Sequence, residues 1–236
     1  MQSLTYVASF QAISATGAKP VACDVDPETL CLDWADAEKR LTPRTKAVMP
    51  VHYAGSVGAL DEIYAFAKKY DLRVIEDAAH AFGSEYKGNK VGGFGDIACF
   101  SFDGIKNITS GEGGCIVTDD QEILQKVRDA RLLGVERDTT NRFLGERSWE
   151  FDVTAQGWRY HMSNIMAAIG TEQLKRFPMF ADKRRMIARL YDNLLSDSDG
   201  IKVFSFDYDQ VIPHIYVIGL GENFNRSKIR KSLDDK

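Results

Sequence analysis

A carboxylate and an amine lie at the ends of two apolar segments near the middle of the chain. Asp77 closes the segment VIED, and Lys106 lies just beyond the segment ACFSF. If both segments are strands of one sheet, the two side chains are held on a rigid support. The amine can then form a Schiff base with an aldehyde, while the carboxylate pairs with a cationic ring nitrogen. These are the two groups with which an enzyme holds pyridoxal phosphate.

Taken separately, the two residues also have ordinary structural readings. A carboxylate after a strand commonly caps the next helix, and a lysine beyond a strand is commonly a surface residue. Their shared setting changes this interpretation. The sequence SFDGIKNITSGEGG places Lys106 between a strand and a glycine-rich turn, where little side-chain bulk would obstruct a cofactor. The pair therefore predicts a cofactor site.

The first half of the chain alternates short β-rich runs with helical patterns, which is typical of an α/β fold with a mostly parallel central sheet and flanking helices. Leu60, Ile63, Tyr64 and Ala67 follow helical spacing. Asp119, followed three residues later by Glu122, predicts a capped helix. The expected strands are 20–25, 47–51, 73–76, 97–102 and 115–118.

The second half has a different character. Residues 137–150 are polar without a clear period and predict a long surface loop. Two helices follow, one marked by apolar residues at 165, 166 and 169 and one by those at 187, 190, 191 and 194. A strand is expected at 214–220 and a helix from Ser227. We therefore expect a large domain over 1–178, and over 179–236 a linker helix with the start of a smaller α+β C-terminal domain.

Composition and spacing argue against several other classes of protein. The 236 residues carry 30 basic and 34 acidic side chains in mixed order, so no nucleic-acid footprint stands out. The basic group 183–185 with Arg189 predicts a solvated helix face. The first residues do not have the pattern of a leader, no apolar run reaches membrane length, and the four cysteines form no CxxC pair. We therefore expect a cytoplasmic protein. The four histidines lack metal-ligand spacing, so no metal is expected.

A glycine motif offers an alternative cofactor class. Gly93–Ala98 reads G-x-G-x-x-A, which matches a dinucleotide fingerprint. That fingerprint follows a strand and opens a helix, whereas here it precedes a predicted strand. We interpret these glycines as a turn that enters the strand before Lys106.

Several longer segments resemble one family. EDAAHA, GNKVGGFGDIACFSF, the block SF-three-residues-K, EGG and GWRYHMSNIMAAIG occur in the order of the DegT/DnrJ sugar-nucleotide aminotransferases, which are fold-type I pyridoxal-phosphate enzymes. By this resemblance Lys106 is the Schiff-base lysine and Asp77 the partner of the ring nitrogen. The resemblance also implies further cofactor-binding residues: His80 at the ring hydroxyl, Ser101 at the phosphate, Tyr6 stacked on the ring, and His161 reaching into the neighbouring subunit's site.

The resemblance implies a function as well. It implies transfer of an amino group from glutamate, which leaves 2-oxoglutarate, to a nucleotide-linked keto-sugar, with C4 as the favoured position, in a homodimer with shared active sites. A sister branch that dehydrates its substrate has histidine where this chain has Lys106. Family members have further residues before the point that corresponds to Met1, including a phosphate-binding turn, and a fuller C-terminal domain. The alternative is therefore a truncated, non-catalytic module that binds sugar nucleotides or dimerises.

Overall fold

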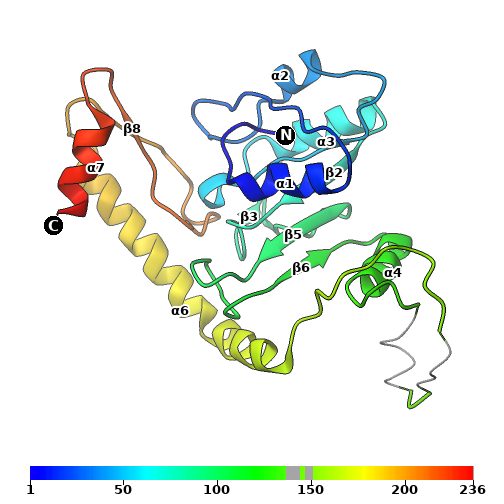
Figure 1. Ribbon diagram of the computed structural model, residues 1–236. Helices are drawn as coiled ribbons and strands as arrows, with labels where there is room; N and C mark the ends of the chain where they lie inside the picture. The colour runs from blue at the N-terminus through cyan, green and yellow to red at the C-terminus, as the bar shows by residue number, and fades with distance from the viewer. Residues whose placement is uncertain (137–143, 147–150, 236) are drawn as a thin grey trace.

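The computed structural model describes residues 1–136, 144–146 and 151–235, and it contains a central sheet of four strands in the order β1-β2-β5-β6 (Figure 1). β1 pairs with β2 and β2 with β5 in parallel, whereas β5 and β6 are antiparallel. The expected α/β architecture is confirmed, with one antiparallel edge. The strands are β1 (Ala47–Val48), β2 (Arg73–Asp77), β5 (Ile97–Ser101) and β6 (Gly114–Val117).

Short helices and one small hairpin lie around this sheet. α3 contacts β2 and α2, and its buried side chains Ile63 and Phe66 share an apolar cluster with Val48 and Val74. A second cluster joins Leu60 to Ala98 and Phe100 of β5. These elements are α1 (Val7–Ala15), α2 (Trp34–Lys39), η1 (Tyr53–Gly55), α3 (Leu60–Lys69), β3 (Glu85–Tyr86), β4 (Asn89–Lys90) and α4 (Gln121–Ala130).

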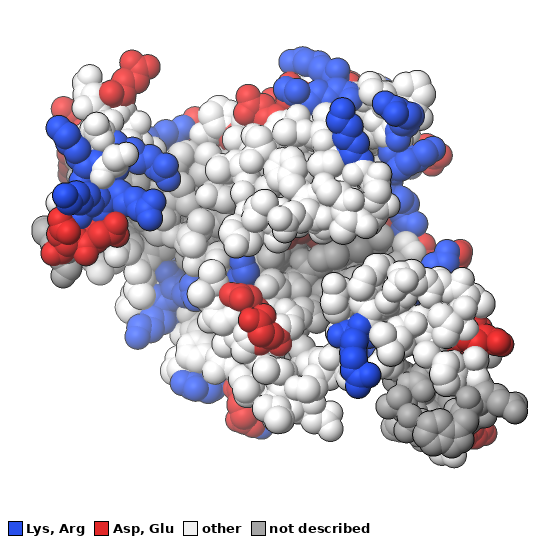
Figure 2. Space-filling view, in the orientation of Figure 1, with Lys and Arg blue, Asp and Glu red and all other residues white. Residues whose placement is uncertain are grey.

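The C-terminal part extends away from the sheet along one long helix, α6 (Asn164–Leu195), which leads to a small hairpin and α7 (Figure 1). The hairpin consists of β7 (Ile201–Val203) and β8 (Ile218–Leu220), and α7 spans Arg226–Asp234. Lys and Arg side chains gather over α7, whereas the middle of the face around α1 is mostly uncharged (Figure 2). No helix in the described part of the chain is both long and apolar enough to cross a bilayer.

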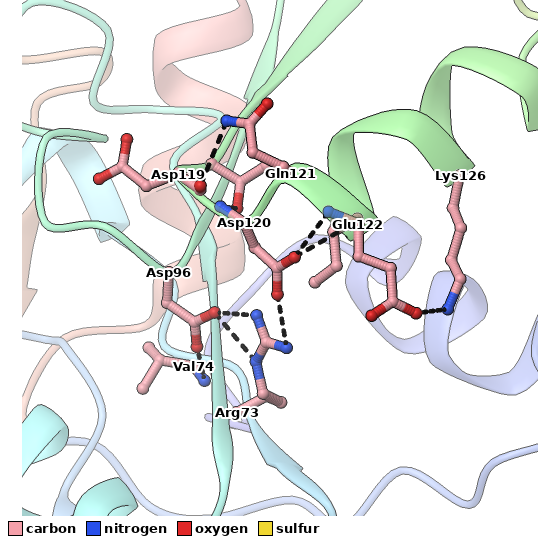
Figure 3. Close-up of polar contacts among 10 residues, drawn as sticks. Arg73, Val74, Asp96, Asp119, Asp120, Gln121, Glu122 and Lys126 are labelled. Carbon is pink, nitrogen blue, oxygen red and sulfur yellow. Dashed lines mark hydrogen bonds and ion pairs between the residues drawn. The ribbon is translucent and has the colours of Figure 1, made fainter. Parts of the chain in front are cut away.

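The two ends of the parallel strands β2 and β5 carry different groups. At the amino ends, Arg73 binds Asp96 at 2.5 Å and Asp120 at 3.3 Å, and the Val74 N–H donates to Asp96 at 2.6 Å (Figure 3). This cluster joins β2, the turn before β5 and the start of α4. At the carboxyl ends lie Asp77 and Ser101, the last residues of β2 and β5. Parallel strands therefore bring these two side chains to one edge of the sheet.

One expected strand and one expected helix cap differ in the structure. Residues 20–25 form only single bridges, Gln2 with Cys23 and Val25 with Leu32, rather than a strand. The Asp26 carboxylate accepts hydrogen bonds from the two N–H groups of 28 and 29, which closes a turn and ends the pairing. α4 is capped by Asp120 instead of Asp119, because the Asp120 side chain accepts from the N–H groups of 122 and 123.

The two helices expected after residue 163 are one continuous helix. α6 begins after the Ser163 cap and passes through Pro178. Proline removes one N–H from a helix, but its fixed φ lies close to the helical value, so the helix can continue at the loss of one hydrogen bond. The expected boundary between 1–178 and 179–236 falls inside this helix, and the division into domains stays a prediction.

The basic group on α6 is not simply a solvated face. Arg184 donates to the carbonyls of Pro213 and His214 at 3.3 and 3.0 Å, and Arg185 donates to that of Asp209 at 3.2 Å. Arg189 pairs with the Asp209 carboxylate at 2.7 Å. The expectation failed because the arginines bind a segment that is distant in sequence.

The C-terminal strand prediction is correct only in part, because β8 begins at Ile218 rather than 214. The backbone N–H of His214 donates instead to the Ala54 carbonyl at 3.1 Å, which directs the chain toward the central sheet. The expected helix from Ser227 is α7. The expected loop 137–150 lies, apart from 144–146, outside the described residues.

Candidate active site

Asp77 is fixed at the carboxyl end of β2 by two donors. The Ser9 hydroxyl, on α1, donates to Oδ2 at 2.7 Å, and the Ala79 N–H donates to Oδ1 at 3.2 Å. Ser9 also lies 2.8 Å from the Thr5 hydroxyl. Two donors leave further lone pairs on the carboxylate. Asp77 can therefore bind one more donor or cation without losing its support.

Lys106 lies in the connection between β5 and β6. Its backbone N–H donates to the Asp103 carbonyl at 3.1 Å, and the next residue, Asn107, is buried. The Asn107 amide donates to the carbonyls of Ile212 at 3.2 Å and His80 at 3.4 Å. Asn107 thus fixes the connection to the segments that carry His80 and Ile212, while the Lys106 side chain stays half-buried.

His80 lies close enough to both groups to sense their charges. The pKa of His80 is lowered to about 4, chiefly by burial and also by the Lys106 ammonium, while the Asp77 carboxylate opposes both effects. The structure therefore brings Lys106, Asp77 and His80 together, as the sequence predicts. An amine, a carboxylate and an uncharged imidazole share one edge of the sheet.

The other three predicted site residues are less directly connected. Ser101 ends β5 at the same edge, and its hydroxyl accepts from the Asp103 N–H at 3.3 Å. Tyr6 caps α1 and is 73% exposed. His161 lies just before α6 with its Nδ1 buried and unpartnered among the described residues. In that part of the chain, no hydrogen bond or ring contact joins Tyr6 or His161 to Lys106, so their roles stay predictions.

A buried polar network lies directly behind Asp77 and was not predicted from the sequence. His52 Nε2 lies 2.6 Å from Glu76 Oε2, and the Tyr64 hydroxyl donates to Glu76 Oε1 at 2.7 Å. His52 and Glu76 are almost fully buried, and burial together with the Glu76 carboxylate raises the pKa of Tyr64. The backbone N–H of His52 also donates to the backbone carbonyl of Asp77 at 3.0 Å. The network thus supports the backbone that carries Asp77.

Sequence reasoning missed two further residues that touch the site. Ser9 gave no signal, because a serine in a helix has no distinctive pattern. His214 was assigned to a strand, although its ring lies 4.2 Å from that of His80, centroid to centroid. Its position after the proline at 213, which disfavours regular pairing, is a signal that could have marked it.

The decisive comparison is with known families. Residues 1–236 match the model of the DegT/DnrJ/EryC1/StrS aminotransferase family. The chain belongs to this family.

Individual members of the family are similar over almost the whole chain. The spore coat polysaccharide biosynthesis protein SpsC of Bacillus subtilis is 38% identical over 99% of this chain and 61% of its own length. Among solved structures, Helicobacter pylori PseC, an aminotransferase in pseudoaminic acid biosynthesis, has a TM-score of 0.88 and 30% identity over 99% of this chain and 62% of its own. DesI, solved in the presence of its TDP-sugar product, has a TM-score of 0.85 and 31% identity over 99% of this chain and 58% of its own.

This aminotransferase family uses pyridoxal phosphate, and the residues present fit that group. An amine, a carboxylate with spare lone pairs and an imidazole lie together at the carboxyl edge of the sheet, where open α/β sheets bind ligands. The chain spans between about half and two thirds of the length of the curated relatives that it matches.

Proposed function

We propose that this chain carries the catalytic residues of a pyridoxal-phosphate aminotransferase that moves an amino group from glutamate to a nucleotide-linked keto-sugar, with C4 as the favoured position. The observation that carries the proposal is the grouping of Lys106, Asp77 and His80 at one edge of the sheet. The names of similar proteins, which include a TDP-sugar enzyme and a polysaccharide biosynthesis protein, support the sugar-nucleotide substrate.

Each residue has a distinct task in this proposal. Pyridoxal phosphate supplies an aldehyde and an electron-withdrawing ring. Lys106 would hold the aldehyde, and its free amine would accept and return the proton at the substrate carbon. Asp77, fixed by Ser9, keeps the ring nitrogen protonated, because a neighbouring carboxylate favours the cation. His80 would donate a hydrogen bond to the ring hydroxyl, and Ser101 would bind the phosphate.

A homodimer with shared sites is part of the same proposal. Large apolar side chains are exposed along the first half of α6 and the segment before it, including Trp158, Tyr160, Ile165, Ile169 and Leu174. Contiguous exposed apolar surface is typical of an interface. Tyr6 would then stack on the cofactor ring, and His161 would reach the partner's site. A cytoplasmic location is proposed on the basis of four unpaired cysteines.

The test is the visible absorption spectrum of the protein mixed with pyridoxal phosphate, recorded before and after glutamate is added. We expect a yellow band that glutamate bleaches. Borohydride reduction before glutamate should attach the cofactor to the peptide that contains Lys106. Lys126→Ala, which changes an exposed lysine of α4, is the matched control and should behave as the unchanged protein. Absence of any band would favour a non-catalytic module of the same fold.

A further inference from the structure

Ala54 adopts a left-handed backbone conformation beside His80. Its φ is 58° and ψ is 7°, and its side chain is fully buried. Residues with a Cβ rarely adopt this conformation, and it persists where the surroundings impose it. Both peptide groups of Ala54 are engaged. Its N–H donates to His80 Nδ1 at 3.4 Å, and its carbonyl accepts from the His214 N–H at 3.1 Å. The strained turn therefore links the two histidines.

The hydrogen bond from Ala54 determines where the His80 proton lies. An uncharged imidazole has one nitrogen that donates and one that accepts. Because Nδ1 accepts from a backbone N–H, the proton belongs on Nε2. Among the described residues, Nε2 of His80 has no hydrogen-bond partner, so its N–H remains available to a ligand.

His214 restrains the ring of His80. The two ring centroids lie 4.2 Å apart at an interplanar angle of 39°, and Tyr53 also contacts the His80 ring at 5.9 Å. His214 is itself held firmly, because Arg184 binds its carbonyl at 3.0 Å. Rotation of the His80 ring would break the hydrogen bond from Ala54 and disturb the ring contact with His214. The contacts therefore favour one ring orientation.

The charged groups around the pair keep both rings neutral. Burial and Lys106 lower the pKa of His80 to about 4 against the opposing Asp77. The pKa of His214 is lowered to about 3, chiefly by burial and also by His80, Lys106 and Arg184, and Asp103 opposes this shift. An uncharged His80 has a definite tautomer, because a doubly protonated ring could not accept from Ala54.

We propose that His214 is a positioning residue that, together with the left-handed turn at Ala54, holds His80 as the tautomer protonated at Nε2. His80 then presents a fixed, uncharged N–H donor to the site. The target of this donor, the ring hydroxyl of the cofactor, rests on the proposed function. The tautomer itself is a property of the chain without cofactor.

The test is nitrogen-15 NMR of the imidazole rings in the cofactor-free protein, in which only four histidines contribute. His80→Gln assigns the His80 signals. We expect an Nε2-protonated pattern for His80 that persists from pH 7 to pH 5. In His214→Ala the pattern should change to mixed tautomers, and the titration midpoint should rise toward about 6.5. His214→Phe keeps an aromatic face and should preserve the wild-type tautomer.

Two results would overturn the proposal: an Nδ1-protonated or mixed pattern in the wild type, or an unchanged pattern in His214→Ala. The signals of His52, which pairs with Glu76, report whether each variant is folded. His214→Leu replaces His214→Ala if the latter does not fold, because leucine fills the space without an aromatic face.

Cofactor titration separates this proposal from the proposed function. Loss of one neutral hydrogen bond corresponds to roughly two- to tenfold weaker binding, which we expect for pyridoxal phosphate with His214→Ala relative to His214→Phe. If the wild type shows the expected tautomer but binds no cofactor, the proposed function fails and the positioning role stands. If cofactor binds and the tautomer is mixed, the positioning role of His214 fails and the proposed function stands.

Discussion

The two ends of strands β2 and β5 show how one sheet separates stability from chemistry. At the amino ends, Arg73 is partly exposed and pairs with the carboxylates of Asp96 and Asp120. At the carboxyl ends, Asp77, His80 and Lys106 lie together with a lowered histidine pKa. Paired surface charges mainly tie elements together, whereas half-buried titratable groups with unused hydrogen-bonding capacity are typical of functional sites.

Removal of the amine should give the largest difference between the two ends. Lys106→Ala should lower transamination by about 10³-fold or more, because the residue both holds the cofactor and moves a proton. Turnover with glutamate as donor measures the effect, and circular dichroism checks the fold. Appreciable turnover by this variant would remove Lys106 from its assigned role.

Disruption of the network behind Asp77 should chiefly affect stability. Glu76→Ala leaves the buried His52 and Tyr64 groups without their partner, so we expect a loss of about 3 kcal/mol in the free energy of unfolding. Urea unfolding measures it. Glu76→Gln keeps the shape and an acceptor for Tyr64, and should be less destabilising than Glu76→Ala. Equal stability of Glu76→Ala and wild type would show that the network contributes little.

Neutralisation of the site carboxylate tests the chemical role of the same strand. Asp77→Asn keeps the size of the side chain and its acceptor for Ser9. The Schiff base with Lys106 should still form, while the proton-transfer step slows by about 10²-fold or more, because the charge that favours a protonated ring nitrogen is lost. Single-turnover kinetics with glutamate measures this step. A rate near that of the wild type would assign the ring nitrogen another partner.

Acidification should weaken the carboxyl-end cluster through its histidines. Burial lowers the pKa values of His80 and His214 to about 4 and about 3, below the ordinary 6.5 of the unfolded chain. Between these values the unfolded chain binds more protons than the folded chain. The stabilisation is therefore complete above about pH 6.5 and decreases as the pH is lowered. Each histidine contributes a slope of up to about 1.4 kcal/mol per pH unit.

Urea unfolding from pH 7 to pH 4 measures this slope, and His214→Phe should show a shallower one. Carboxylates such as Asp120, whose pKa is lowered by backbone hydrogen bonds, also lose stabilising interactions in acid. They are common to both proteins and cancel in the difference. Equal slopes would contradict the protection of His214 from protonation.

The amino-end cluster should give the smallest effect. Arg73 is about half exposed, so Arg73→Ala should cost about 1 kcal/mol or less in the free energy of unfolding. Cofactor affinity should not change, because the cluster lies at the opposite end of the strands. A large loss of affinity would show that the two ends are coupled.

Local patterns predicted the parts of the fold that depend on local forces. The apolar runs gave β2, β5 and β6 within about one residue, and the spacing of Leu60 and Ile63 gave α3. The grouping of Asp77 with Lys106 follows from the rule that parallel strands share their carboxyl edge. The proximity of this candidate pair was therefore predictable from residue types and spacing.

Contacts between distant segments were not predictable in this way. The ring contact of His214 with His80 joins parts of the chain that share no local pattern. Ser9 binds Asp77 from a helix whose sequence gives no polar signal. The two separate groups of apolar residues, at 165–169 and at 187–194, suggested two helices, because local patterns do not reveal that one helix continues between them.

The arginines of α6 bind the segment 209–214 largely through its backbone carbonyl oxygens, which every amino acid possesses. These bonds therefore constrain the number of residues in the segment more than their identity, although Val211 and Ile212 are buried and should stay apolar. An inserted residue would move His214 out of register with His80, while Arg184 and Arg185 would still have backbone carbonyls to bind. Relatives should accordingly keep the length of this segment more strictly than the identity of its exposed residues.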